Sequence, residues 1–279
     1  MKFLLRLPFV GRFILFFYRW KILLSLRMPS HWQAWRWLFV SRETTNFTYE
    51  LDDLSRAYLV DFIALATNCD VDRVEAYIRE IEQDEELRGH ILHHLSQHPD
   101  RYKSDRSVLY ARRVGWYALV RILRPRVVIE TGIDKGLGCC VLCAALRRNA
   151  AEGDKGHHYG TDINPAAGYL LQAPYKEFGT ILYGDSIESL KKIDQPVDLF
   201  INDSDHSAEY EAREYEVILP KMSEKGIIVS DNAELADSLH KFSRRHRRQF
   251  LFWRETPKAH WFAGAGIGIS LPVKQNVGL

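Results

Sequence analysis

No apolar run in this chain of 279 residues is both long enough and free enough of charge to cross a membrane. Basic residues interrupt the apolar N-terminus at Arg6, Arg12, Arg19, Lys21 and Arg27. A spanning helix needs about 18 or more consecutive, predominantly apolar residues, so the sequence excludes such a helix there. No small-residue cleavage pattern follows a clean apolar stretch, and we therefore expect no secretory leader.

Cysteine is also scarce. The chain has four cysteines, three of them close together: Cys69, Cys139, Cys140 and Cys143. They form neither a disulfide framework nor the paired Cys-x-x-Cys pattern of a structural zinc site. We expect buried, reduced thiols and a reducing compartment, the cytoplasm. A hydrophobic content of 46% is enough to build a core.

Acidic residues are absent from residues 1–42, which carry eight of the 38 Lys and Arg residues. The formal net charge is +2, so the rest of the chain is acidic. Basic residues around an aromatic, leucine-rich body at residues 1–27 are typical of a helix lying on an anionic membrane, here the inner face. A helix packed on the rest of the protein, or on a second copy in a homodimer, gives the same pattern. Both interpretations stay open, and we predict no nucleic-acid partner.

Residues 43–105 have the periodicity of a small helical unit. Apolar residues recur at helical spacing from Leu51 to Leu65, and Asp70 is a plausible N-cap for a helix that ends at Ile81. A further helix, after a break, is predicted for residues 82–98. Four histidines of this last segment are expected to be exposed rather than metal-bound: His90, His93, His94 and His98. We expect the unit to cover the edge of a sheet and to shape a substrate pocket.

A strand and a glycine-rich loop follow. The apolar segment 126–132 ends in Glu130 and Gly132, and Gly136 and Gly138 come shortly after it. Glycines allow a tight turn and a close approach of the backbone to a ligand. The spacing differs from the G-x-G-x-x-G dinucleotide fingerprint, which disfavours a nicotinamide oxidoreductase. A second strand, 156–162, ends in Asp162, and an acid at this position can accept hydrogen bonds from ribose hydroxyls.

Two later apolar runs end in polar residues. The run from Asp198 continues into Asp203, Asp205 and His206, and the run 226–230 continues into Asp231 and Asn232. Parallel strands deliver the residues that follow them to one edge of the sheet, so four oxygen donors should converge. Mg²⁺ and Ca²⁺ prefer oxygen ligands. The alternative is that these residues are helix caps and turn formers.

The remaining pattern completes an α/β fold. Strands are predicted at residues 126–132, 156–162, 179–183, 197–202, 226–230, 248–254 and 264–271. Helices are predicted at residues 139–148, 207–220 and 233–247. A basic run on the last of these helices is interpreted as a solvated face. The domain boundaries we expect are residues 1–42 for the basic apolar segment, 43–105 for a helical cap, and 106–279 for the α/β domain.

The ordered motifs from Glu130 to Asn232 resemble those of class I methyltransferases that depend on S-adenosylmethionine (SAM). The last two motifs most resemble the cation-dependent O-methyltransferases, such as catechol and caffeoyl-CoA O-methyltransferases and bacterial sugar O-methyltransferases. The resemblance covers roughly residues 106 to 272. It implies a doubly wound, Rossmann-like sheet of seven mostly parallel strands with an antiparallel last strand, preceded by an N-terminal helical extension.

The resemblance also implies roles for particular residues. The implied cofactor residues are Glu130 and Gly132 near the methionine part of SAM, Gly136 in the loop, Asp162 on the ribose, Asp185 beside the adenine, and Asp203. The implied ligands of Mg²⁺ or another divalent cation are Asp203, Asp231 and Asn232. His206 stands where caffeoyl-CoA-type enzymes carry a lysine base, and Asp205 stands where some sugar-modifying relatives carry an aspartate base. The chain departs from the pattern in lacking that lysine and in having Asn202 before Asp203.

The predicted function is therefore SAM-dependent, cation-assisted O-methylation of a vicinal diol, in a sugar, glycan or glycolipid. Two adjacent oxygens can chelate one cation, which stabilises the developing alkoxide. A base removes the proton, and both His206 and Asp205 are candidates. Two alternatives stay open: a catechol-type enzyme for small molecules, and a non-catalytic cofactor-binding module docked on a membrane or a partner.

Overall fold

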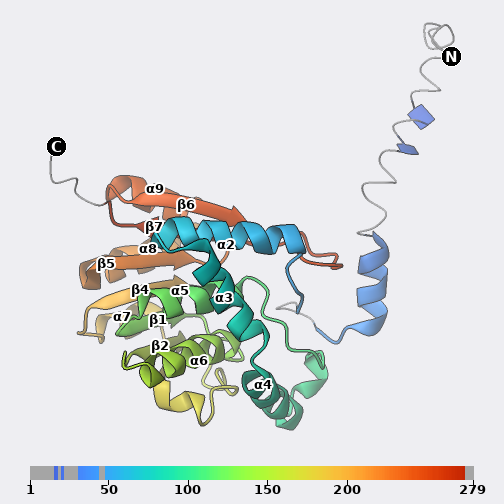
Figure 1. The fold of residues 1–279 in the computed structure, drawn as a ribbon, viewed down its shortest axis with the longest axis horizontal. Helices are drawn as coiled ribbons and strands as arrows, with labels where there is room; N and C mark the ends of the chain where they lie inside the picture. Colours follow the sequence, from blue (N-terminus) through green and yellow to red (C-terminus); the bar gives the residue numbers. More distant parts are fainter. Residues whose placement is uncertain (1–15, 18–19, 22–30, 44–47, 274–279) are drawn as a thin grey trace, which may run out of the picture.

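The computed structural model describes residues 16–17, 20–21, 31–43 and 48–273, and the following account concerns these residues. Seven strands form one sheet in the order β3-β2-β1-β4-β5-β7-β6 (Figure 1). Their bounds are β1 Val127–Thr131, β2 His157–Asp162, β3 Gly179–Tyr183, β4 Val197–Asn202, β5 Met222–Ser230, β6 Gln249–Arg254 and β7 Gly266–Leu271. The β7 strand is antiparallel to both of its neighbours, and the other pairs are parallel. The predicted Rossmann-like fold is confirmed.

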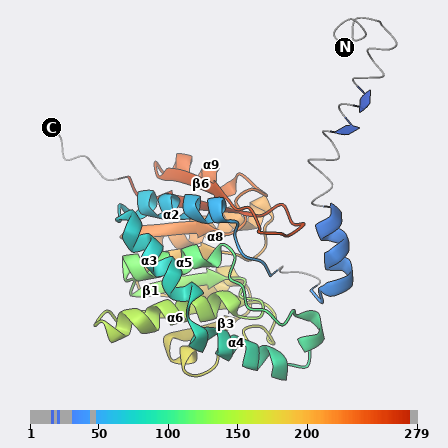
Figure 2. The same ribbon diagram turned by 45° about the vertical axis from the view of Figure 1, so that its right-hand side comes forward.

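Helices cover both faces of the sheet (Figures 1 and 2). Their bounds are α2 Asp53–Thr67, α3 Val71–Glu82, α4 Glu85–Gln97, α5 Arg113–Leu123, α6 Leu137–Ala151, α7 Ser186–Lys191, α8 Ala208–Ile218 and α9 Ser238–Arg245. Alternate residues of β1 point to opposite sides, so Val128 packs under α5 and α6 whereas Ile129 packs with residues of α7, α8 and α9. Two apolar cores result, one on each face of the sheet.

The helical unit predicted for residues 43–105 forms an outer layer on the α5 and α6 side. Asp70 caps α3, since its side chain accepts hydrogen bonds from the backbone N–H groups of Asp72 and Arg73. The chain then breaks between α3 and α4 at Gln83 and Asp84. The α2 and α3 helices pack against α5, and α4 packs against α6.

The histidine prediction needs correction, because only His93 of the four is exposed. The Nε2 atom of His90 lies 2.9 Å from the carbonyl oxygen of Leu170. The His98 ring stacks on Tyr169 with ring centroids 3.7 Å apart. These rings face the segment that follows β2, so part of their surface is covered by protein rather than by water.

The second correction concerns the helix predicted for residues 233–247, which begins only at Ser238. The N–H of Ala233 donates to the carbonyl oxygen of Gly266, 2.9 Å away, and the N–H of Leu235 donates to Asn232. These bonds hold residues 231–235 in turns against β7. The other predicted elements are present with shifted ends.

The N-terminal prediction for residues 1–27 lies largely outside the described residues. Residues 31–40 are helical and lie to one side of the sheet domain in both views (Figures 1 and 2). Trp37 links them to the body, with its ring 5.2 Å from that of Trp261. Within the described part of the chain, no helix combines the length and the apolar character that crossing a membrane requires.

Candidate active site

The ends of three central strands lie level with one another. Thr131 of β1 is paired with Asn202 of β4, and Asn202 is paired with Ser230 of β5. The next residues continue the ladder, since Asp203 N–H donates to Thr131 and Asp231 N–H donates to Asn202, both at 2.9 Å. Gly132, Asp203 and Asp231 therefore emerge side by side at the carboxyl edge of the sheet, where open α/β folds keep their sites.

The glycine loop is fixed by close contact with this edge. Gly132 has φ +78°, and a Cβ atom there would lie 2.0 Å from the carbonyl oxygen of Asp203. A Cβ atom on Gly138 would lie 1.9 Å from Oε1 of Glu130. At Gly132 the obstacle is backbone, so only glycine fits there, and the loop between β1 and α6 can bring its backbone to the edge.

A cavity of about 350 Å³ opens at this edge. Its walls come from the glycine loop, from Asp162 at the end of β2, from the segments after β4 and β5, and from the helical unit. The predicted site residues among its lining are Glu130, Gly132, Asp162, Asp203, His206 and Asn232. Gly136, Asp185, Asp205 and Asp231 do not line it.

Asp162 is held in place at the cavity by two backbone donors. Its carboxylate accepts hydrogen bonds from the N–H of Asp134 at 3.0 Å and from the N–H of Asn164 at 2.8 Å. The bond from Asp134 joins the glycine loop to the end of β2. Asp185 instead caps α7, because its carboxylate accepts a hydrogen bond from the N–H of Glu188 at 3.0 Å. This hydrogen bond is the main reason why the pKa of Asp185 is lowered.

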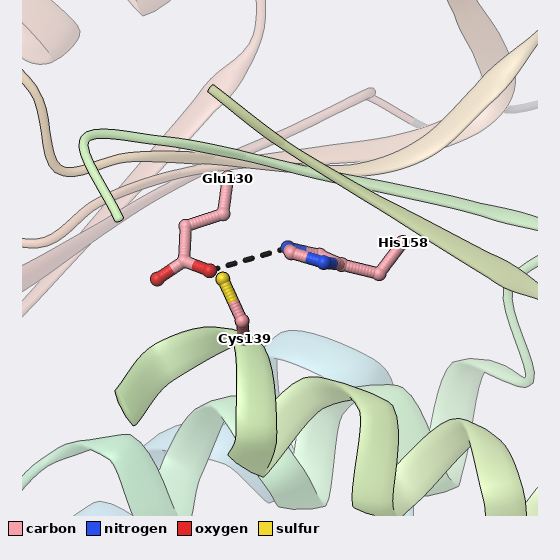
Figure 3. A group of neighbouring side chains, drawn as sticks. All are labelled: Glu130, Cys139 and His158. Carbon is pink, nitrogen blue, oxygen red and sulfur yellow. Dashed lines mark ion pairs between the residues drawn. The ribbon is translucent and has the colours of Figure 1, made fainter. Parts of the chain in front are cut away.

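Glu130 belongs to a buried cluster with Cys139 and His158 (Figure 3). Its Oε2 lies 3.2 Å from His158 Nε2, and the ligand atoms of the three side chains lie within 4.8 Å of one another. Burial, together with the Glu130 charge, raises the pKa of the Cys139 thiol well above its ordinary value. This thiol is therefore a poor nucleophile, in line with the predicted buried cysteines.

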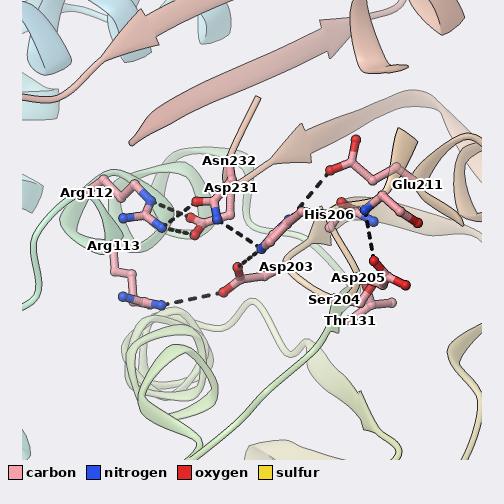
Figure 4. Close-up of polar contacts among 12 residues, drawn as sticks. Arg112, Arg113, Thr131, Asp203, Ser204, Asp205, His206, Glu211, Asp231 and Asn232 are labelled. Atoms are coloured by element: carbon pink, nitrogen blue, oxygen red, sulfur yellow. Dashed lines mark hydrogen bonds and ion pairs between the residues drawn. The ribbon is translucent and has the colours of Figure 1, made fainter. Parts of the chain in front are cut away.

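Arginine side chains dominate the other end of the cavity (Figure 4). Arg112 Nε donates to Asp231 Oδ1 at 2.8 Å, and its Nη2 donates to the second oxygen of the same carboxylate and to Asn232 Oδ1 at 2.9 Å. Arg112 Nη1 pairs with Glu255 at 3.0 Å. Arg113 Nη2 lies 3.5 Å from Asp203 Oδ2.

The pKa values of Asp203 and Asp231 are shifted in opposite directions. Burial and the neighbouring Asp231 charge raise the pKa of Asp203 well above its ordinary value. Burial opposes ionisation of Asp231 too, but the charges of Arg112 and Arg113 outweigh it and lower the pKa of Asp231. Of the two aspartates, Asp231 is therefore the one whose charged form Arg112 favours.

His206 is connected to Arg112 through Asn232. Because Asn232 Oδ1 accepts from Arg112, its Nδ2 must be the atom 2.9 Å from His206 Nε2, and it donates there. His206 Nε2 is then an acceptor, and the ring proton lies on Nδ1, which faces Glu211 Oε1 at 3.6 Å. Asp205 is exposed and accepts from the N–H of Ser207 at 2.9 Å.

A buried acid, Glu214 of α8, lies beneath the sheet edge. It accepts hydrogen bonds from Ser204 Oγ at 2.8 Å and from Thr131 Oγ1 at 3.4 Å, and also from Asn202 and Ser186. Burial raises the pKa of Glu214 to about 7 despite these donors. Through these hydrogen bonds, Glu214 links Thr131 at the end of β1 to Asn202 at the end of β4.

The three predicted cation ligands are neighbours, but they do not fit a divalent cation as the structure holds them. Both oxygens of Asp231 and the amide oxygen of Asn232 accept hydrogen bonds from Arg112. Asp231 is 0% exposed and does not face the cavity. A cation needs these oxygens free and convergent.

The sequence did not predict a place in the site for Arg112, Arg113, Glu214 or Glu255. One signal was available for the arginines, which stand at the N-terminal end of an apolar helix. The helix dipole disfavours cations at that end, so their position indicates partners elsewhere. Nothing in the local pattern marks Glu255 or Glu214.

Part of the sequence matches a known family, and the fold is similar to that of solved structures. Residues 129–233 match the model of a family described as methyltransferase domain. The O-methyltransferase TomG of Streptomyces achromogenes, solved in complex with SAM, is 15% identical, with 66% of this chain and 89% of that chain covered and a TM-score of 0.51. The methyltransferase PaMTH1 of Podospora anserina, solved with SAH, is 18% identical over 73% of this chain and 95% of that chain, with a TM-score of 0.48. No curated protein matches the sequence.

The fold and the edge site are thus similar to those of Rossmann-like methyltransferases. Residues 129–233 match the methyltransferase family model, and the resemblance to SAM-dependent methyltransferases is confirmed for this segment and for the fold.

Proposed function

We propose that the protein transfers the methyl group of SAM to a hydroxyl group of its acceptor. One observation carries this proposal: the glycine loop with Asp162 and the imidazole of His206 line the same cavity. The first two are features of a nucleoside site, and the third is a proton acceptor. A cofactor and a reacting hydroxyl can therefore meet in one cavity.

SAM would lie along the glycine loop, with its ribose hydroxyls on Asp162 and its amino group near Glu130. Asp162 is already oriented by two backbone N–H groups, so little conformational freedom is lost on binding. Asp185 is not part of this proposal, because its carboxylate is used as a helix cap outside the cavity.

His206 is the base in this proposal. The acceptor hydroxyl would replace the N–H of Asn232 at His206 Nε2 and give up its proton there while its oxygen attacks the methyl group. The carbon–sulfur bond of the sulfonium breaks and leaves a neutral thioether, and the proton stays on His206. Glu211 Oε1, 3.6 Å from Nδ1, would stabilise the imidazolium.

A sugar is the acceptor that we favour. The helical unit and the segments on either side of it contribute hydroxyl and carboxylate groups to the cavity: Glu43, Thr48, Ser104, Asp105 and Ser107. Groups of this kind bind several hydroxyls at once, as a sugar requires. A catechol would need a flatter and more apolar wall.

We also propose that the protein works at an anionic membrane surface, through the basic N-terminal segment. The described part of this segment presents unusually exposed aromatic side chains, with Trp32 72% and Phe39 82% exposed. Aromatic and basic residues together are typical of interfacial helices. A glycolipid would then reach the cavity from the membrane.

The test measures cofactor binding and methyl transfer separately. Calorimetry should detect binding of SAH, and radiolabelled SAM should pass its methyl group to a sugar-containing extract. His206→Ala should lower the rate about 10²–10⁴-fold and leave SAH binding intact. Asp205→Asn, one residue away, is the matched control and should change the rate little. Absence of SAH binding would refute the proposal, and a large effect confined to Asp205→Asn would transfer the role of base to Asp205.

A further inference from the structure

The structure assigns to Arg112 the place that cation-dependent enzymes give to a divalent metal ion. We infer that the site binds no such ion and that the guanidinium, fixed between Asp231 and Asn232, acts in its stead. This inference rests on the proposed methyl transfer and specifies how the charge of the site is provided.

The guanidinium contacts two of the three predicted cation ligands, Asp231 and Asn232. Its Nε and Nη2 atoms donate hydrogen bonds to the two oxygens of Asp231, and Nη2 also donates to Asn232 Oδ1 at 2.9 Å (Figure 4). An arginine fork matches a carboxylate in this two-point geometry, and each such bond is charge-assisted. Asp203, the remaining predicted ligand, faces the second guanidinium, that of Arg113, at 3.5 Å.

Arg112 is anchored from behind, so it cannot simply move aside for an ion. Its Nη1 lies 3.0 Å from Glu255 Oε1 and 3.3 Å from the hydroxyl of Tyr49. That hydroxyl and the N–H of Ala265 both donate to the same Glu255 oxygen, at 2.5 Å and 2.8 Å. Arg112 is 7% exposed and Glu255 is 1% exposed. Displacing Arg112 would leave a buried carboxylate without its cation, which is strongly unfavourable.

The guanidinium takes over two roles of a metal ion: it neutralises a carboxylate, and it orients a neighbouring side chain. It neutralises Asp231, and it sets the amide of Asn232 so that Nδ2 faces His206 Nε2 at 2.9 Å. The ring nitrogen toward the cavity is thereby kept unprotonated. Since no ion has to be chelated, the acceptor needs only one hydroxyl at the reacting position and not a vicinal diol.

The experiment titrates Mn²⁺ into the purified full-length protein after treatment with chelator, with electron paramagnetic resonance reporting free Mn²⁺. We expect no Mn²⁺ binding of submillimolar affinity, and the same SAH affinity with and without the ion. Submillimolar binding that Asp203→Asn abolishes would overturn the inference. Failure to bind SAH at all would refute the proposed function instead, so the two failures are distinguishable.

Arg112→Gln supplies the complementary measurement. Removing the guanidinium frees the oxygens of Asp231 and Asn232, so this variant should gain a Mn²⁺ site, and Mn²⁺ should raise its melting temperature. The added substitution Asp203→Asn should remove the gain, and Arg79→Gln, on the exposed face of α3, should show none. A folded Arg112→Gln protein without any Mn²⁺ affinity would also overturn the inference. If this variant does not fold, the titration of the native protein decides.

Discussion

Replacing Glu214 with glutamine should change how stability depends on pH. Burial raises the pKa of this carboxyl group from its ordinary value of 4.5 to about 7. The native state therefore binds a proton that the unfolded state releases. The stabilisation is fully present below about pH 4.5 and is lost as the pH rises through about 7.

The expected size follows from the shift in pKa. One pKa unit corresponds to about 1.36 kcal/mol, so a shift from 4.5 to about 7 is worth on the order of 3 kcal/mol in the free energy of unfolding. Glutamine cannot ionise and removes this dependence. From about pH 5 to about pH 8, the stability of Glu214→Gln relative to the native protein should therefore rise by roughly 2–3 kcal/mol.

Urea unfolding followed by circular dichroism at several pH values measures the difference. Only its slope with pH is informative, because glutamine also disturbs the bonds from Ser204, Thr131, Asn202 and Ser186 at every pH. Glu209→Gln, exposed on the same helix, is the matched control and should give a flat difference. A flat difference for Glu214→Gln would show that the acid is ionised throughout and would refute the reasoning.

Two further predictions concern the cofactor and the membrane. Asp162→Asn should weaken SAH binding by about 10- to 100-fold in calorimetry, since a charge-assisted hydrogen bond contributes about 1.5–3 kcal/mol. Asp185→Asn is the control, because the Asp185 carboxylate lies outside the cavity. It should bind SAH almost as the native protein does. Equal losses of affinity in both variants would contradict the assignment of Asp162 to the cofactor site. Deletion of residues 1–27 should abolish co-sedimentation with anionic vesicles, and salt should weaken that of the full chain, because each basic residue adds about 1 kcal/mol at an anionic surface. If the full chain were recovered equally in the supernatant with and without vesicles, membrane binding would be refuted. The alternative that residues 1–27 pack on protein would then remain.

The order of elements could be predicted because their signals are local. The segments ending near Thr131, Asp162, Asn202 and Ser230 were each predicted as a strand, and each is one. The start of α3 followed from Asp70, whose side chain satisfies free N–H groups of the first turn. The start of α9 could not be predicted, because residues 231–235 form turns and Ala233 is hydrogen-bonded to Gly266 on a distant strand.

The sequence by itself determined that Gly132, Asp203 and Asp231 meet, since parallel strands deliver the residues that follow them to one edge. Only the tertiary structure decided what surrounds them. Arg112 is 119 residues from Asp231 and 143 residues from Glu255, and no local pattern encodes such a pairing. The packing of α5 on the sheet sets it, and a side chain buried there must find its charge partners wherever the fold supplies them. A set of oxygens that reads as a metal site in the sequence is therefore, in the folded chain, the binding site of its own arginine.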